Sequence, residues 1–392
     1  MTDDLAPYAF LDSASRGRRH AEPTHPFRTP FQRDRERIVH SSAFRRMTGK
    51  TQVLFASVND HHRTRLTHTL EVTQVARTVA RRLRLNEDLT EAIALSHDIG
   101  HPPFGHEGEN TLDRCLVNDG GFNHNLFGLR RVDLLEERYP DFPGLNLTFE
   151  VREAFVRHAN RMDAEVGQEF RTLGAPFLEA LVVDEVDSIA YDTHDIDDAL
   201  GLGFLSFDDL ENVECWSRAA EVVRKQYPSL PPHAFRTAVV RELLAWQVTD
   251  LIDETARRIR DNNVTTLDRV RSATVPLVGN SEYGTRLKTE LETFLHARVY
   301  RHEKVLAMKS NGDRILRTLF TEYVKHPELL PDRHLRRWVG AEAILGPAKH
   351  PPLPGRIPLN SLPLVVCDYL AGMTDRFAMR ELNRLFQSMI DL

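Results

Sequence analysis

Apolar residues recur at the three- to four-residue spacing of amphipathic helices along most of this chain, and no alternating pattern of any length interrupts them. No internal repeat appears either. Because a strand that buries one face needs period-two alternation, this patterning predicts a predominantly α-helical fold built as a bundle. The predicted helices span residues 34–44, 67–85, 89–99, 107–117, 132–135, 151–158, 177–200, 218–226, 232–262, 285–307, 312–323 and 364–390.

The length of the chain, 392 residues, allows one large domain or one domain with an appendage. Residues 1–30 are polar and contain four prolines, and 347–363 is a proline-rich loop before the last predicted helix. We therefore expect an N-terminal arm and basic segment over 1–60, a metal-binding core over 61–200, and a helical C-terminal region over 201–392 that packs on the core.

Composition excludes several classes of protein. Three scattered cysteines, Cys115, Cys215 and Cys367, are too few for a disulfide framework. Without a secretory segment or a run of about 18 apolar residues, we expect a cytoplasmic protein with no membrane partner. The net charge of −6 argues against a protein that coats nucleic acid. Residues 28–50, however, carry seven Lys or Arg against two acids, which suits either a small polyanion or a solvated basic face.

Four residues with metal-binding side chains lie within segments that otherwise predict apolar-faced helices: His68, His97, Asp98 and Asp187. His97 and Asp98 end one helix, because Gly100 and two prolines follow them. Asp187 lies among apolar helical neighbours, where a buried carboxylate requires a partner, and a cation supplies one. Two imidazoles and two carboxylates suit Mn, Fe, Ni, Zn or Mg with positions open for water and phosphate. We therefore predict metal-assisted hydrolysis.

The loop GHPPFGHEGE adds a second group of side chains beside the predicted metal site. His106 and Glu109 are three residues apart at the start of a helix, so they can share a face. They form either a proton-transfer dyad or, in the simpler interpretation, a helix cap with a favourable acid in the first turn.

The segments FRRMTGKTQV, HHRTRLTHTLEV, EAIALSHDIGHPPFGHEGE and EVDSIAYDTHDIDDAL resemble the deoxyguanosine triphosphate triphosphohydrolase branch of the HD superfamily. The resemblance is dense over residues 33–200 and thinner beyond. It implies an all-α HD-domain helical bundle with additional C-terminal helices. It also implies a divalent cation on His68, His97, Asp98 and Asp187, and hydrolysis of a deoxynucleoside triphosphate (dNTP) to deoxynucleoside and triphosphate.

The same resemblance extends to residues around the metal. It implies that His106 and Glu109 are the catalytic dyad, and that His101 and His124 lie in the pocket, where they can bond phosphate oxygens. Arg65, one turn before His68, can offer its planar fork to phosphate, although a surface ion pair would explain it too. The resemblance places Tyr191 and Asp195 against the sugar and Gln52 near the sugar or base. The simpler interpretation is that Tyr191 packs in the core and Asp195 ends an acidic helix.

Alternative functions remain at this stage. Another HD phosphohydrolase, such as a nucleotidase or phosphodiesterase, would use the same metal ligands. A regulatory protein that binds nucleotides or single-stranded DNA would use the basic residues 28–50. Members of the family often form oligomers, and some need a nucleotide activator, so a homo-oligomer and a nucleotide or single-stranded DNA effector are expectations that follow from the resemblance alone.

Overall fold

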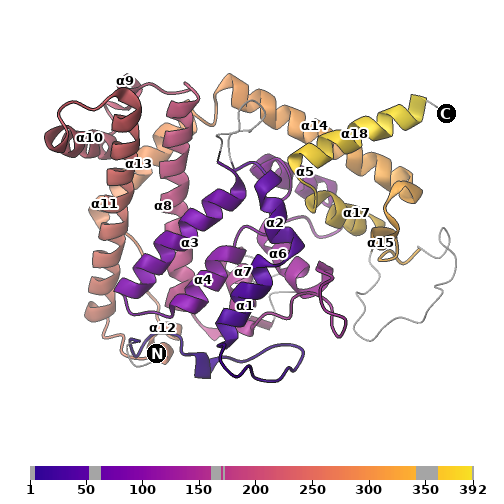
Figure 1. The fold of residues 1–392 in the computed structure, drawn as a ribbon, viewed down its shortest axis with the longest axis horizontal. Helices are drawn as coiled ribbons and strands as arrows, with labels where there is room; N and C mark the ends of the chain where they lie inside the picture. Colours follow the sequence, from indigo (N-terminus) through magenta and orange to yellow (C-terminus); the bar gives the residue numbers. More distant parts are fainter. Residues whose placement is uncertain (1–4, 53–62, 160–168, 171–172, 341–360, 391–392) are drawn as a thin grey trace.

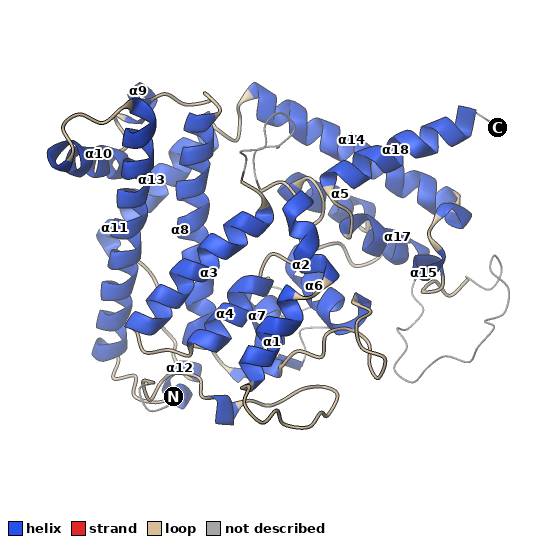
Figure 2. Cartoon of the chain, viewed as in Figure 1, coloured by secondary structure: helices blue, strands red, loops and turns tan. Residues whose placement is uncertain are grey.

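The computed structural model describes residues 5–52, 63–159, 169–170, 173–340 and 361–390. Within these ranges the regular elements are helices, and extended pairing is limited to isolated bridges (Figure 2). The predicted all-α fold is therefore confirmed. None of the described helices combines the length and the apolar character needed to cross a lipid bilayer.

The central part of the molecule is a bundle around the largest core (Figure 1). Its side chains come chiefly from amphipathic helices, among them fully buried Val72, Leu89 and Val186. Burying this apolar face is what stabilises the helices, because helix propensity alone is weak. The helices of this part are α1 (Pro30–Val39), α2 (Ser42–Arg46), α3 (Arg65–Arg82), α4 (Glu87–Ser96), α7 (Phe149–His158), α8 (Leu178–Gly201) and α12 (Leu267–Arg271).

Two smaller cores flank the central bundle on opposite sides in Figure 1. One is formed by α5 (Gly105–Cys115), α6 (His124–Arg130), α14 (Glu303–Lys325), α15 (Asp332–Leu335), α17 (Leu362–Ala371) and α18 (Asp375–Ile390). The other lies between the end of α8 and helices α9 (Phe207–Leu210), α10 (Glu214–Gln226), α11 (Pro232–Asp261) and α13 (Glu282–Arg298). Short 3-10 or π elements are η1 (Asp12–Ala14), η2 (Met47–Gly49), η3 (Arg131–Leu135) and η5 (Pro327–Leu329).

Three of the segments predicted as single helices are interrupted in the structure. The segments 34–44, 285–307 and 364–390 are each two helices rather than one. Side-chain caps provide the physical reason at two of the breaks. Ser41 accepts a hydrogen bond from the amide of Phe44 and starts α2, and His302 accepts one from Lys304 and starts α14. Apolar spacing runs on through such breaks, because a cap changes the backbone of only one or two residues.

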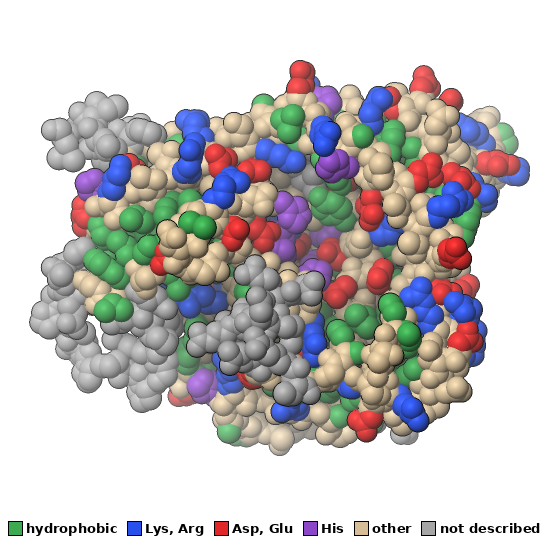
Figure 3. All heavy atoms as spheres, turned by 180° about the vertical axis from the view of Figure 1, so that it is seen from behind, with side chains coloured by type: hydrophobic (Ala, Val, Ile, Leu, Met, Phe, Trp, Pro, Cys, Tyr) green, Lys and Arg blue, Asp and Glu red, His purple; other side chains and the backbone are tan. Residues whose placement is uncertain are grey.

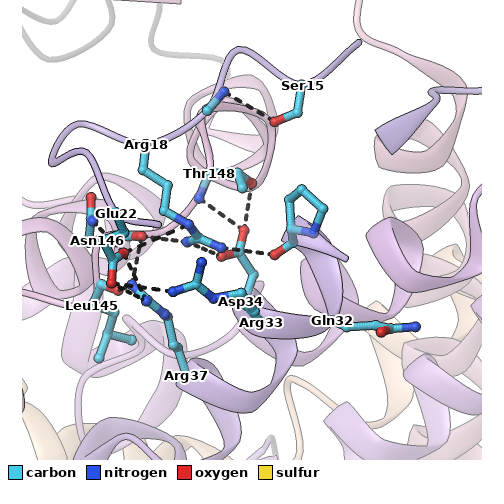
Figure 4. Close-up of polar contacts among 12 residues, drawn as sticks. Ser15, Arg18, Glu22, Gln32, Arg33, Asp34, Arg37, Leu145, Asn146 and Thr148 are labelled. Carbon is cyan, nitrogen blue, oxygen red and sulfur yellow. Dashed lines mark hydrogen bonds and ion pairs between the residues drawn. The ribbon is translucent and has the colours of Figure 1, made fainter. Parts of the chain in front are cut away.

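The N-terminal segment is tied to the bundle by a buried carboxylate (Figure 4). Asp34 of α1 is fully buried and accepts hydrogen bonds from the guanidinium of Arg18 and from the backbone and hydroxyl of Thr148. The ring centroid of Phe10 lies 5.3 Å from that of Phe177, inside the central core. Residues 5–30, which the sequence indicated as an irregular arm, therefore contribute to the packing of the central bundle.

Candidate metal centre

Three helices of the central bundle bring the four predicted ligands together. His68 lies in the first turn of α3, His97 and Asp98 follow the end of α4, and Asp187 lies in the middle of α8. Nε2 of His68 is 2.8 Å from Oδ1 of Asp187, and Nε2 of His97 is 3.5 Å from that same oxygen. Candidate ligand atoms of His68, His97 and Asp98 all lie within 4.8 Å of one another.

The imidazole of His97 shows that these residues fit a cation. Its Nδ1 lies 2.6 Å from the carbonyl oxygen of Ala94, which can only accept, so Nδ1 carries the proton. Its Nε2 is buried, has no hydrogen-bond partner among the described residues, and lies 3.5 Å from a carboxylate oxygen of Asp98. Positive charge is needed between this nitrogen and the two carboxylates, and either a proton on Nε2 or a cation supplies it. A divalent cation satisfies all of these atoms at once.

The pKa shifts of the site residues agree with a cation-binding site. Burial raises the pKa of Asp98, but Arg65 and His97 outweigh that effect and hold the pKa well below its usual range. Burial likewise raises the pKa of Asp187, and His97 and His68 more than offset it. Conversely, burial lowers the pKa of His97, while Asp98 and Asp187 raise it well above the usual value. The carboxylates are therefore ionised and the site is selective for positive charge.

Arg65 is in direct contact with the predicted ligand Asp98. Helix α3 begins at Arg65, two residues before the predicted start at residue 67, so Arg65 lies one turn before His68 on the same helix. Its guanidinium is buried, with one nitrogen 2.8 Å from Oδ2 of Asp98 and another 3.3 Å from the carbonyl oxygen of Gln52. The simpler interpretation as a surface ion pair is wrong, because the ion pair is buried. Arg65 orients a predicted ligand, and its contact with phosphate stays a prediction.

His101 and His124 lie face to face beside Asp98. Their ring centroids are 3.7 Å apart, and Nε2 of His101 lies 3.1 Å from Oδ1 of Asp98. Burial, followed by Arg65 and His124, lowers the pKa of His101 well below its usual value. The close approach depends on Gly100, where a Cβ atom would lie 2.0 Å from the carbonyl oxygen of His124. No larger residue fits there without moving α6.

The predicted dyad is assembled with a third member. Nδ1 of His106 lies 3.6 Å from Oε2 of Glu109, and the His106 side chain is 56% exposed. Glu109 also accepts hydrogen bonds from the backbone amide and from Nδ1 of His124, both at 2.8 Å. The alternative of His106 as a helix cap is wrong, because the N-cap of α5 is Phe104 and no side chain caps it.

Tyr191 and Asp195 extend from the metal centre along α8. The Tyr191 ring centroid is 6.3 Å from that of His106 and 6.2 Å from that of Tyr300. Asp195 is buried and accepts a hydrogen bond from the hydroxyl of Tyr300. Burial raises the pKa of Asp195 well above its usual value, with Asp198 adding to the rise. Tyr300, which sequence reasoning missed because it lies in a distant segment, thus joins this row of side chains.

Gln52 lies at the edge of the same region, and its position depends on the C-terminal helices. Its side chain is buried, and Oε1 has no hydrogen-bond partner among the described residues. The preceding residue, Thr51, donates through its amide and hydroxyl to Asp375 at the start of α18. Asp375 also accepts from the amide of Phe104. Sequence reasoning did not single out Asp375, because it lies 324 residues from Thr51 and its contacts, with two backbone amides and one hydroxyl, follow no sequence pattern.

The basic residues 28–50 are mostly engaged within the protein. Arg35 pairs with Asp88 and Glu91 of α4, and Arg37 donates to Glu22 and to two backbone carbonyls. Lys50 is buried, with its ammonium 2.5 Å from the carbonyl oxygen of His101. Arg45 and Arg46 instead line a cavity together with other arginines, among them Arg131, Arg138, Arg333, Arg337 and Arg380. The basic side chains described at residues 28–37 are therefore largely paired within the protein, whereas Arg45 and Arg46 belong to this arginine-lined cavity.

Histidine side chains gather near the centre of the face shown in Figure 3, next to acidic ones. Comparisons with known proteins define the class of protein to which this chain belongs. The family model described as the HD domain matches residues 65–192, which span the four predicted ligands. The model described as the phosphohydrolase-associated domain matches residues 280–350 and 361–384. The chain is thus an HD-domain phosphohydrolase.

The particular family follows from relatives that match almost the whole chain. A protein of Geobacter metallireducens is 43% identical over 386 residues, which are 98% of this chain and 95% of the relative. One of Bordetella pertussis is 43% identical over 395 residues, or 99% and 97% of the two chains. Both are described as deoxyguanosinetriphosphate triphosphohydrolase-like proteins. This chain belongs to that family, as the sequence motifs predicted.

Proposed function

We propose that this protein hydrolyses deoxynucleoside triphosphates, dGTP among them, to the deoxynucleoside and intact triphosphate. His68, His97, Asp98 and Asp187 would hold the divalent ion this requires, with Mn, Mg, Fe, Ni and Zn all compatible with the donor set. The observation that carries the proposal is the buried Nε2 of His97, which lies 3.5 Å from carboxylate oxygens of both Asp98 and Asp187 without a hydrogen-bond partner in the described chain.

A bound cation would polarise the α-phosphate and lower the pKa of a water at the site. Side chains of the protein would transfer protons, contact the phosphate and orient the metal ligands. His106, whose side chain is 56% exposed beside Glu109, would move a proton to or from the reacting oxygens. His101 and His124, whose rings stack on each other, would contact phosphate oxygens, and the ion pair between Arg65 and Asp98 keeps that carboxylate oriented.

The side chains along α8 support a deoxynucleoside as the group that leaves with its 5′ oxygen. Tyr191 presents an aromatic ring between His106 and Tyr300, and Asp195 offers a buried carboxyl group beyond it. A deoxyribose would stack on Tyr191 and bond its 3′-hydroxyl to Asp195, and the ring would penalise a 2′-hydroxyl. Gln52 would face the sugar or base with its unpaired amide oxygen.

The test is product analysis of the protein loaded with Mn²⁺ and incubated with each dNTP and NTP, separately and mixed. Triphosphate and deoxynucleoside in equal amounts are the expected products, and chelation should abolish their release. Mixtures test a nucleotide activator, which would appear as hydrolysis of one dNTP only in the presence of another. Release of orthophosphate would indicate a nucleotidase, and release of pyrophosphate a different cleavage, so either result would contradict the proposal.

A nucleic-acid-binding role receives less support, because the arginines of residues 28–37 are paired within the protein. Association with single-stranded DNA that weakens steeply with salt, without triphosphate release, would favour that role instead. A homo-oligomer is a further proposal that comes from the family. Size measured by light scattering, with and without dNTP, tests it directly.

A further inference from the structure

A chain of hydrogen bonds runs from the surface to one predicted metal ligand. Oε2 of Glu71 on α3 lies 2.5 Å from Nε2 of His194 on α8. Nδ1 of His194 lies 3.0 Å from Nδ1 of His68, and Nε2 of His68 faces Asp187. The exposed fraction of the side chain falls along the chain from 47% at Glu71 to 6% at His194 and 0% at His68.

With His194 neutral, counting donors and acceptors assigns the protons in this chain. The carboxylate of Glu71 can only accept, so Nε2 of His194 must carry a proton. A neutral His194 then has a lone pair on Nδ1, which accepts from Nδ1–H of His68. That assignment leaves the lone pair of His68 on Nε2, directed at Asp187, which is where a cation would bind. With a cation between His68 and Asp187, each of these nitrogen and oxygen atoms is satisfied.

Glu71 is held in its ionised form and in place from outside. Burial raises its pKa, but the hydrogen bonds and charges of His194 and Arg63 outweigh burial and lower the pKa to about 2. Arg63 also donates to Asp198 at 2.9 Å, one turn beyond His194 on α8. The guanidinium therefore links α3 to α8 on the outer side of the pair.

From this geometry we infer that Glu71 and His194 are positioning residues that hold His68 in the tautomer able to bind the metal. The inference rests on the metal site of the proposed function and adds two residues to it. A carboxylate behind a ligating histidine fixes its orientation and raises its basicity, and loss of such a partner weakens metal binding by about 10- to 100-fold. Here the carboxylate acts through a second imidazole.

The test measures the dissociation constant for Mn²⁺ alone, by calorimetric titration of the metal-free full-length protein. Glu71→Gln removes the charge with little change in shape. Glu91→Gln is the matched control, because Glu91 also pairs with arginines, Arg35 and Arg77, but contacts no predicted ligand. His194→Asn keeps an acceptor near the position of Nδ1, whereas His194→Leu has a similar shape and no acceptor.

We expect Glu71→Gln and His194→Leu to weaken Mn²⁺ binding by about 10- to 100-fold. His194→Asn should bind more tightly than His194→Leu, and Glu91→Gln should match the wild type. The thermal midpoint of each metal-free variant reports folding separately. If the His194 variants do not fold, Glu71→Gln, at a half-exposed position, decides the question.

Wild-type affinity in Glu71→Gln, or equal affinity in folded His194→Asn and His194→Leu, would overturn the inference and leave the proposed function intact. A wild-type protein that binds no Mn²⁺ would overturn the metal site of the proposed function, and the inference with it. The two failures are thus distinguishable in one set of titrations.

Discussion

Oε1 of Glu109 lies 2.8 Å from Nδ1 of His124, whereas Oε2 of the same carboxylate lies 3.6 Å from Nδ1 of His106. Glu109 therefore has two tasks. It fixes the first turn of α6 through the backbone and ring of His124, and its other oxygen faces the imidazole of His106. Burial raises the pKa of Glu109, but its hydrogen bonds with His106 and His124 outweigh burial and lower it.

His106→Ala should keep the cation and the fold, because the side chain is more than half exposed and caps no helix. Turnover should fall by about 100-fold or more, as expected for a lost proton-transfer group. Metal content by elemental analysis and steady-state kinetics measure the two effects. His124→Ala serves as the comparison, because it also removes a partner of Glu109 and should lower the thermal midpoint. A near-normal rate in His106→Ala would remove it from the catalytic group.

Asp187→Ala should abolish metal binding and hydrolysis together, because it removes the oxygen that faces both His68 and His97. The control is Asp184→Ala on the same helix, where the carboxylate pairs with His158 instead. Elemental analysis after dialysis against Mn²⁺ compares the two variants with the wild type. Full metal content together with full activity in Asp187→Ala would refute its assignment as a ligand.

Asp375→Ala should reduce activity from a distance. The residue accepts hydrogen bonds from Thr51 and Phe104, so it links the loop that carries Gln52 to the start of α5. Removing the acceptor leaves buried donors unpaired, which costs about 1–3 kcal/mol of unfolding free energy. We expect an increased KM for dNTP with an unchanged dissociation constant for Mn²⁺. An unchanged KM in a destabilised variant would limit Asp375 to a structural role.

His334 should make the protein sensitive to acid. Burial lowers its pKa to about 3, and Arg337 and Arg333 contribute, whereas an unfolded histidine titrates near 6.5. Between these two values the unfolded chain binds the proton and the folded chain does not. His334 therefore leaves the free energy of unfolding unchanged above about pH 6.5. As the pH falls from there toward 3, it lowers that free energy by at most about 1.4 kcal/mol per pH unit.

His334→Asn should reduce that pH dependence. Urea unfolding of wild type and variant between pH 7 and 5 measures it, since the difference between their unfolding free energies should shrink or change sign as the pH falls. Parallel curves for the two proteins would show that His334 is protonated equally well in the folded state.

Local patterns predicted the all-α fold correctly, and the metal site that they indicated stays a prediction. The predicted ligands His97 and Asp98 were placed at a helix end because a glycine and prolines follow them, and this end is present, at Ser96 rather than residue 99. Helix breaks at Ser41 and His302 were missed, because one capping side chain redirects the backbone without disturbing apolar spacing. The motif that contains Asp187 also contains His194, yet spacing alone gave no reason to single it out.

The sequence by itself determined the helical class, the family and the set of side chains available to bind a cation, because these depend on periodicity and residue type. Only the tertiary structure decided how those side chains are oriented. Contacts between helices bring Arg65 to Asp98 and bring Glu109 to His124. They also bring His194 of α8 within hydrogen-bonding distance of His68 of α3. Hydrogen bonds act over about 3 Å, so partners far apart in sequence are chosen by packing, which no local pattern encodes.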